Sequence, residues 1–96
     1  MTYRFLPPAK RDLAKAADYY DHAVPGLGLE FLNEVERTIA RILRHPKAWT
    51  KVTVHHRKCR TRRFPYGIIY AVEGDVVIIS AVMHGHRHPD YWISRS

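Results

Sequence analysis

The stretch GIIYAVEGDVVIISAV, residues 67–82, decides the fold class of this 96-residue chain. It contains two runs of β-favouring residues, at 67–72 and 75–82, and Gly74-Asp75 between them supplies a hairpin turn. The second run is apolar almost throughout, which is typical of a strand that is central in its sheet or covered on both faces. The sequence therefore predicts an antiparallel hairpin whose second strand lies inside the fold.

Shorter β-compatible runs lie outside this hairpin, at 2–6, 52–54 and 57–64. Pro7-Pro8 ends the first run because proline cannot continue a central strand. The later runs follow one another so closely that no crossover connection fits between them. They are therefore expected to pair antiparallel with their neighbours.

Between the first strand and the later ones, apolar residues recur at steps of three and four, as on one face of an amphipathic helix. One helix is expected over 9–24 and another over 27–43, and Pro25-Gly26 breaks the pattern between them. This order predicts an α+β fold in a single domain, residues 1–96. We expect an N-terminal strand, a helical hairpin packed on one face of an antiparallel sheet of about four strands, and a short C-terminal turn or helix.

The net charge of +7 is concentrated in the middle of the chain. Ten positive charges and no acidic residue lie between Glu36 and Glu73, namely Arg37, Arg41, Arg44, Lys47, Lys51, Arg57, Lys58, Arg60, Arg62 and Arg63. Such a field attracts nucleic acid, phosphate-rich assemblies or an acidic protein segment, and a merely solvated basic surface is the alternative. We expect these cations to lie largely on the strands, on the sheet face that the helices leave open.

Cysteine content and hydropathy exclude other classes of protein. Cys59 is the only cysteine, so neither an internal disulfide nor a cysteine-rich zinc module can form. No apolar run approaches the ~20 residues that a membrane helix needs. These features predict a cytoplasmic protein without a membrane partner.

The segment MHGHRHPDYW, residues 83–92, places histidines at three alternating positions. On an extended strand, His84, His86 and His88 would share one side and could bind a transition metal. Gly85 and Pro89 indicate instead that the strand has ended, and a metal would also need a further ligand or a supporting shell. No metal or other cofactor is therefore predicted.

The same segment also fits metal-independent RNA cleavage. His84 could act as a base or an acid, while Arg63 and Arg87 could neutralise the charge that develops on phosphorus. Tyr91 or Trp92 could stack on an unpaired base. The alternative for these two aromatic residues is a lid that packs on the sheet.

Four motifs along the chain resemble the RelE/ParE superfamily of bacterial type II toxins, in particular the ParE-like members of the plasmid stabilisation type. They are A-x-x-D-L-x-x-A-x-x-Y-Y at 9–20, P-G-L-G-x-x-F at 25–31, R-F-P-Y-x-I-x-Y at 63–70 and H-x-x-R-x-P-x-Y-W at 84–92. The likeness extends from Phe5 to Trp92. In the last motif His86 and His88 occupy variable positions, which further weakens the metal interpretation.

The resemblance implies a toxin that a cognate antitoxin neutralises through an acidic, amphipathic C-terminal segment. Of the two activities in the superfamily, poisoning of DNA gyrase by ParE-like members is favoured, because Gly67 stands where RelE-like nucleases tend to carry arginine. The alternatives are a ribosome-dependent mRNA endoribonuclease and an inactive homologue with a regulatory role in the antitoxin complex. The nuclease would use Arg63, His84, Arg87 and Tyr91, whereas partner contacts are expected at Arg57, Arg60, Arg62, Arg63, Tyr91 and Trp92.

Overall fold

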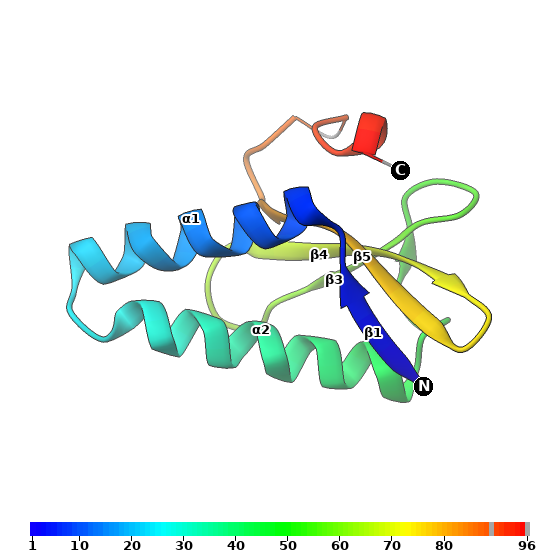
Figure 1. Ribbon diagram of the computed structural model, residues 1–96, viewed down its shortest axis with the longest axis horizontal. Helices are drawn as coiled ribbons and strands as arrows, with labels where there is room; N and C mark the ends of the chain where they lie inside the picture. The colour runs from blue at the N-terminus through cyan, green and yellow to red at the C-terminus, as the bar shows by residue number, and fades with distance from the viewer. Residues whose placement is uncertain (89, 96) are drawn as a thin grey trace.

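The computed structural model describes residues 1–88 and 90–95 and has the predicted α+β architecture (Figure 1). Its sheet has the strand order β1-β5-β4-β3-β2, and helices α1 and α2 form a hairpin on one face of it. Neither helix is long and apolar enough to cross a membrane. The elements are β1 (Thr2–Phe5), α1 (Pro7–Ala23), α2 (Leu27–Arg44), β2 (Thr50–Lys51), β3 (Arg57–Arg60), β4 (Tyr66–Glu73), β5 (Val76–His84) and the short helix η1 (Ile93–Arg95).

The sheet differs from the prediction in the number and direction of its strands. It has five strands and is mixed, because β1 pairs in parallel with β5. Both helices and strands β2, β3 and β4 lie between β1 and β5 in sequence, so the connection is long enough for the two strands to run in the same direction. The strand expected at 52–54 is instead a turn, in which the hydroxyl of Thr53 accepts hydrogen bonds from the amides of His55 and His56.

The two glycines of the P-G-L-G motif have different reasons: Gly26 adopts a left-handed conformation with φ = 90°, and Gly28 lies where the two helices approach closely. A side chain at Gly28 would come within 2.6 Å of the carbonyl oxygen of Ala17 on α1. The carboxylate of Asp21 accepts hydrogen bonds from the amides of Gly26 (2.9 Å) and Gly28 (3.2 Å). The motif is thus a helix–helix turn whose free amides are satisfied by an aspartate at the end of the preceding helix.

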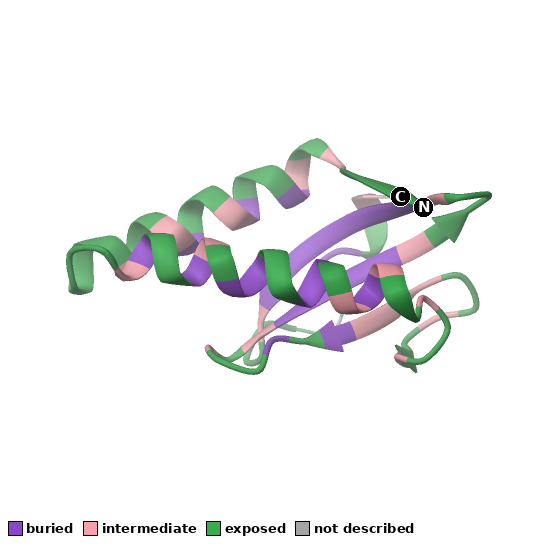
Figure 2. Ribbon diagram, turned by 90° about the horizontal axis from the view of Figure 1, so that it is seen from below, coloured by how far each residue is buried: buried purple, intermediate pink, exposed green. Residues whose placement is uncertain are grey.

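Strand β5 is buried from Val77 to Met83, as its apolar sequence predicts. Register with β4 shifts between Ile69 and Tyr70, so that Ser80 is the extra residue of a bulge. The helix face of the sheet carries the main core, which Figure 2 shows as buried residues on the helix sides turned toward β4 and β5. This core covers one face of β5, and the C-terminal segment covers the other.

The opposite face, called here the far face, is covered over its centre by the C-terminal segment. Trp92 is 3% exposed and packs with Ile69, Ala81 and Met83 in a second core cluster. Its ring centroid lies 4.6 Å from that of His56. The expectation of an open far face is therefore wrong at this place, and Trp92 is the lid that the sequence offered as an alternative.

Replacing Trp92 by alanine is expected to lower the free energy of unfolding by about 3–5 kcal/mol, because a large buried ring is removed. Trp92→Phe, which keeps most of the ring volume, should lose clearly less. Urea denaturation measures both. Ile93→Ala, at a neighbouring side chain that is 48% exposed, is the matched control and should stay within about 0.5 kcal/mol; an equal effect of Trp92→Ala and Ile93→Ala would contradict the burial.

Candidate functional site

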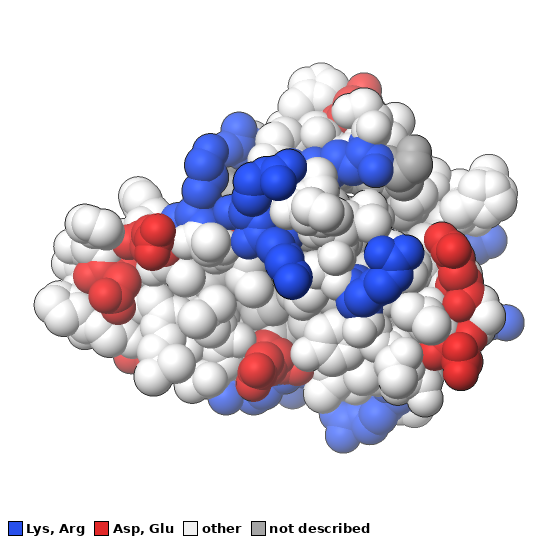
Figure 3. All heavy atoms as spheres, viewed as in Figure 1, with Lys and Arg blue, Asp and Glu red and all other residues white. Residues whose placement is uncertain are grey.

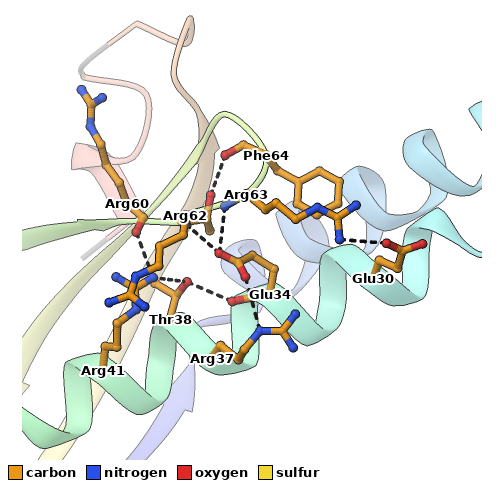
Figure 4. Close-up of polar contacts among 10 residues, drawn as sticks. Glu30, Glu34, Arg37, Thr38, Arg41, Arg60, Arg62, Arg63 and Phe64 are labelled. Atoms are coloured by element: carbon orange, nitrogen blue, oxygen red, sulfur yellow. Dashed lines mark hydrogen bonds and ion pairs between the residues drawn. The ribbon is translucent and has the colours of Figure 1, made fainter.

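The loop between β3 and β4 is held on α2 by one buried carboxylate (Figure 4). Glu34 is 5% exposed, and its Oε2 accepts hydrogen bonds from the amides of Arg62 (2.6 Å) and Arg63 (3.0 Å). Burial alone would raise the pKa of Glu34, but these two amides and the guanidinium of Arg37 outweigh it and hold the pKa below its ordinary value. The loop backbone is therefore fixed by a charged acceptor.

The same loop contains a strained residue. Phe64 has φ = 71°, a left-handed conformation that is uncommon for a residue with a bulky side chain. The hydroxyl of Thr61 donates to the carbonyl of Phe64 (2.7 Å). The centroid of the Phe64 ring lies 4.7 Å from that of the Tyr20 ring and 5.2 Å from that of the Phe31 ring. Packing and hydrogen bonds thus hold a conformation that the loop would not adopt alone.

The predicted cationic residues of this region do not share one surface. On β3, side chains alternate between faces, so Cys59 enters the helix-side core while Lys58 and Arg60 lie on the far face. Figure 4 shows Arg60 pointing away from Arg62 and Arg41. The expectation of a single cationic sheet face is therefore wrong, because strand alternation divides these charges between two sides.

Acidic residues that precede the basic segment in sequence neutralise part of it in space. Arg63 Nη1 lies 2.8 Å from the carboxylate of Glu30, and Arg37 Nε lies 3.5 Å from that of Glu34. Arg57 is directed inward, where its Nη1 donates to the carbonyl of Trp49 (2.8 Å). Among the predicted partner contacts, Arg60 and Arg62 are exposed, and no ion pair is found for either within residues 1–88 and 90–95.

A second buried carboxylate organises the C-terminal motif. Asp12, on α1, is 8% exposed, and its Oδ2 accepts the amide hydrogen of Val82 at a place where β1 no longer pairs with β5 (3.1 Å). Its Oδ1 accepts from the hydroxyl of Tyr91 (2.9 Å) and from Arg95 Nη2 (3.0 Å). The hydrogen bond with Asp12 raises the pKa of Arg95 above its ordinary value.

Two guanidinium groups lie over the Tyr91 ring. The distances from the ring centroid are 4.7 Å for Arg87 and 4.5 Å for Arg95, both within the range of cation–π contacts. Together with the hydrogen bond to Asp12, these contacts fix the position of the phenol. Tyr91 is half-buried and Arg87 is exposed.

The histidines of this motif are turned toward their own backbone. His84 Nδ1 accepts the amide hydrogen of His86 (3.0 Å), and His88 Nδ1 accepts that of Asp90 (3.2 Å). A neutral His84 in this geometry carries its proton on Nε2. Within the described part of the chain, no three histidine, cysteine or acidic side chains lie close enough to hold a metal ion.

Three of the four residues predicted for the nuclease come together in one groove. His84, Arg87 and Tyr91 line a groove of about 700 Å³ between α1 and the end of β5. Arg63 does not line it and is paired with Glu30 instead. The arrangement is therefore an incomplete version of the proposed nuclease site.

The groove also contains residues that the sequence analysis did not single out, among them Asp12, Lys15, Tyr20 and Tyr66. Asp12 and Tyr20 belong to the first of the four motifs and lie eight residues apart, on one face of α1. Helical spacing within that motif was thus the signal that could have placed them on the same side as the C-terminal motif.

The chain matches, over residues 3–89, the model of a family described as "ParE toxin of type II toxin-antitoxin system, parDE". The chain belongs to the ParE toxin family. Its fold is similar to that of a chain from the chromosomal ParDE system of P. aeruginosa, with a TM-score of 0.76 and 17% sequence identity, covering 88% of this chain and 95% of that chain. No curated protein sequence gives a significant match.

In this member of the ParE family, Gly67 is covered by a neighbouring cation. A Cβ atom at Gly67 would lie 2.5 Å from Cε of Lys58, whose side chain crosses the position from β3. An arginine at 67, as in the RelE-like nucleases, would have to displace Lys58. The far face therefore receives its positive charge here from β3 rather than from β4.

Glu34→Gln is expected to lower the free energy of unfolding by about 1.5–3 kcal/mol near neutral pH, because a charged acceptor of two amides is lost. Since the pKa of Glu34 is lowered in the folded protein, this contribution is complete above the unfolded value of ~4.3 and is lost as the pH falls through the lower folded value. Denaturation from pH 7 to pH 3 should show the wild-type advantage shrinking. Glu36→Gln, at an exposed neighbour on α2, is the control, and a pH-independent gap would contradict the role of Glu34.

Proposed function

We propose that this ParE-family chain is a toxin that acts by binding DNA gyrase and is neutralised by a cognate antitoxin. The family match over residues 3–89 is the observation that carries this proposal. Gyrase is the target that the resemblance to ParE-like members implies. The geometry is compatible with action by binding, because the four residues proposed for cleavage do not converge.

Three details argue against a nuclease mechanism. The Tyr91 hydroxyl donates to Asp12, and His84 Nδ1 accepts an amide hydrogen, so neither is free in this arrangement to exchange a proton at those atoms. Arg63 is paired with Glu30, away from the groove. Cleavage requires an acid, a base and a phosphate ligand to act on one substrate.

A ribosome-dependent endoribonuclease is retained as the second candidate on one specific observation. His84, Arg87 and Tyr91, all from the last motif, line the same groove. An inactive homologue that acts only within an antitoxin complex is the third possibility. The three make different demands on the groove residues and are separable by experiment.

For the antitoxin, we propose contact through two exposed arginines, Arg60 at the end of β3 and Arg62 in the β3–β4 loop. Arg62 is carried by the loop that Glu34 fixes, on the side of α2, whereas Arg60 lies on the far face. An acidic segment that contacts both must pass around the edge of the sheet beside β3. Trp92 is buried against the sheet. Tyr91 and Trp92 can therefore contact the antitoxin only if the C-terminal segment detaches from the sheet.

Expression without antitoxin is the test of the function. Gyrase poisoning predicts cleaved DNA, filamentous cells and an SOS response, and the purified protein should inhibit supercoiling by gyrase. Nuclease action predicts arrest of translation with cut transcripts, and loss of both in an Arg87→Ala, Tyr91→Phe variant. Absence of all these effects would overturn both active roles and leave the regulatory one.

Reversal of charge at Arg62 is expected to weaken antitoxin binding about tenfold and to reduce its dependence on salt, since a contact with an acidic segment becomes repulsive. Arg60→Glu should weaken it by a similar factor if the segment passes around the edge. Calorimetry at two salt concentrations measures both. Arg4→Glu, an exposed arginine on β1 at the other end of the sheet, is the control, and unchanged affinity in both variants would reject this surface.

A further inference from the structure

The groove between α1 and the end of β5 has the size and chemistry of a small-ligand site. Its volume of about 700 Å³ falls within the ~300–1,000 Å³ usual for such sites. Lys15 and Tyr19 of α1 form one rim, and Arg87 with the two histidines that precede it forms the other. The half-buried rings of Tyr20 and Tyr66 form the floor.

The electrostatics of the groove favour an anion. Among the described residues that line the groove, Asp12 is the only one with a carboxylate side chain. Both of its oxygens are used within the protein, and its charge is balanced by Arg95. The charges of Lys15 and Arg87 therefore remain, on opposite rims of one groove. Figure 3 shows further Lys and Arg side chains gathered over the N-terminal half of α1.

The floor supplies hydrogen-bond donors without protein partners. Within residues 1–88 and 90–95, neither the Tyr20 hydroxyl nor the Tyr66 hydroxyl makes a hydrogen bond, and the two ring centroids lie 6.1 Å apart. Burial raises the pKa of both tyrosines, so both hydroxyls remain protonated at neutral pH. His84, whose Nδ1 accepts the amide hydrogen of His86, also lines this groove.

The rims add flat rings that are accessible to a ligand. The Tyr19 side chain is 69% exposed although it sits beside a packed aromatic cluster. The rings of His84 and His86 stack with centroids 5.1 Å apart on the opposite side. Exposed rings next to cations are the combination that holds nucleic acid bases and their phosphates, whereas an aliphatic acidic peptide would use the cations and leave the rings unpartnered.

We propose that this groove binds a nucleoside phosphate, with the phosphate against Lys15, Arg87 and the tyrosine hydroxyls and the base against the ring of Tyr19. The site needs no cleavage chemistry and goes beyond the proposed gyrase and antitoxin contacts. The ligand is either a free nucleotide or one nucleotide of a single strand. Both present the same phosphate and base to the groove.

Calorimetric titration of the full chain tests the site with deoxyadenosine monophosphate, deoxyadenosine and inorganic phosphate, and with a ten-residue deoxyadenylate strand. Deoxyadenosine monophosphate is expected to bind at least about tenfold more tightly than either fragment, because each fragment meets only half of the donors and rings. If the strand binds more tightly than the mononucleotide, the site is assigned to nucleic acid. If the two bind with equal affinity per site, it is assigned to a free nucleotide. These deoxy probes lack the 2′-hydroxyl, so the result is independent of ribonuclease activity.

Lys15→Ala and Arg87→Ala are each expected to weaken binding of deoxyadenosine monophosphate about tenfold, and Tyr66→Phe, which keeps the ring and its packing, a few-fold. Lys10→Ala is the matched control, because Lys10 is an exposed lysine on the same helix outside the groove. An equal loss in Lys10→Ala would overturn the site as a general charge effect. Absence of mononucleotide binding to the wild-type chain up to millimolar concentration would also overturn the site. The same holds if the chain binds hexaglutamate through Lys15 and does not bind the mononucleotide.

Discussion

The carboxylate of Asp12 determines where the C-terminal motif lies, because it is buried at the point where β1 leaves β5. The amide of Val82 has no strand partner there, and a buried amide without an acceptor is costly. Asp12 satisfies it and, as a buried charge, needs a cation in return. Arg95 meets that need and, with Tyr91, ties the last described residues to α1. The groove exists because this contact holds its rim.

Glu34 solves the same physical problem at the other side of the helical hairpin. It accepts two loop amides where no strand is available, and in doing so it supports the left-handed conformation of Phe64. Both carboxylates lie on helices, and each accepts a backbone amide that faces away from any neighbouring strand: Asp12 accepts that of Val82 in β5, and Glu34 accepts two in the loop after β3. The loop that begins the third motif and the C-terminal segment that ends the fourth are thus held by charges on α2 and α1, in addition to the sheet pairing of β4 and β5.

This division affects how the net charge of +7 can be used. Because side chains alternate along β3, Arg60 lies on the far face, whereas Arg62 lies in the loop on the side of α2. Arg63 is paired with Glu30. A partner therefore meets separate cationic places and not one continuous basic sheet. An acidic segment that wraps around the edge suits that distribution better than a flat polyanion, and the groove is left to a smaller anionic ligand.

The sequence by itself determined the two helices, the β4–β5 hairpin, the burial of β5 and the family, because periodicity, turn residues and motifs are local properties of the chain. Only the tertiary structure decided that β1 pairs in parallel, that Trp92 covers the far face and that Arg63 is separated from His84, Arg87 and Tyr91. Those outcomes depend on contacts between residues far apart in sequence, such as Asp12 with Arg95. A count of charges along the chain cannot show which carboxylate a cation will meet once the helices have folded back on the sheet.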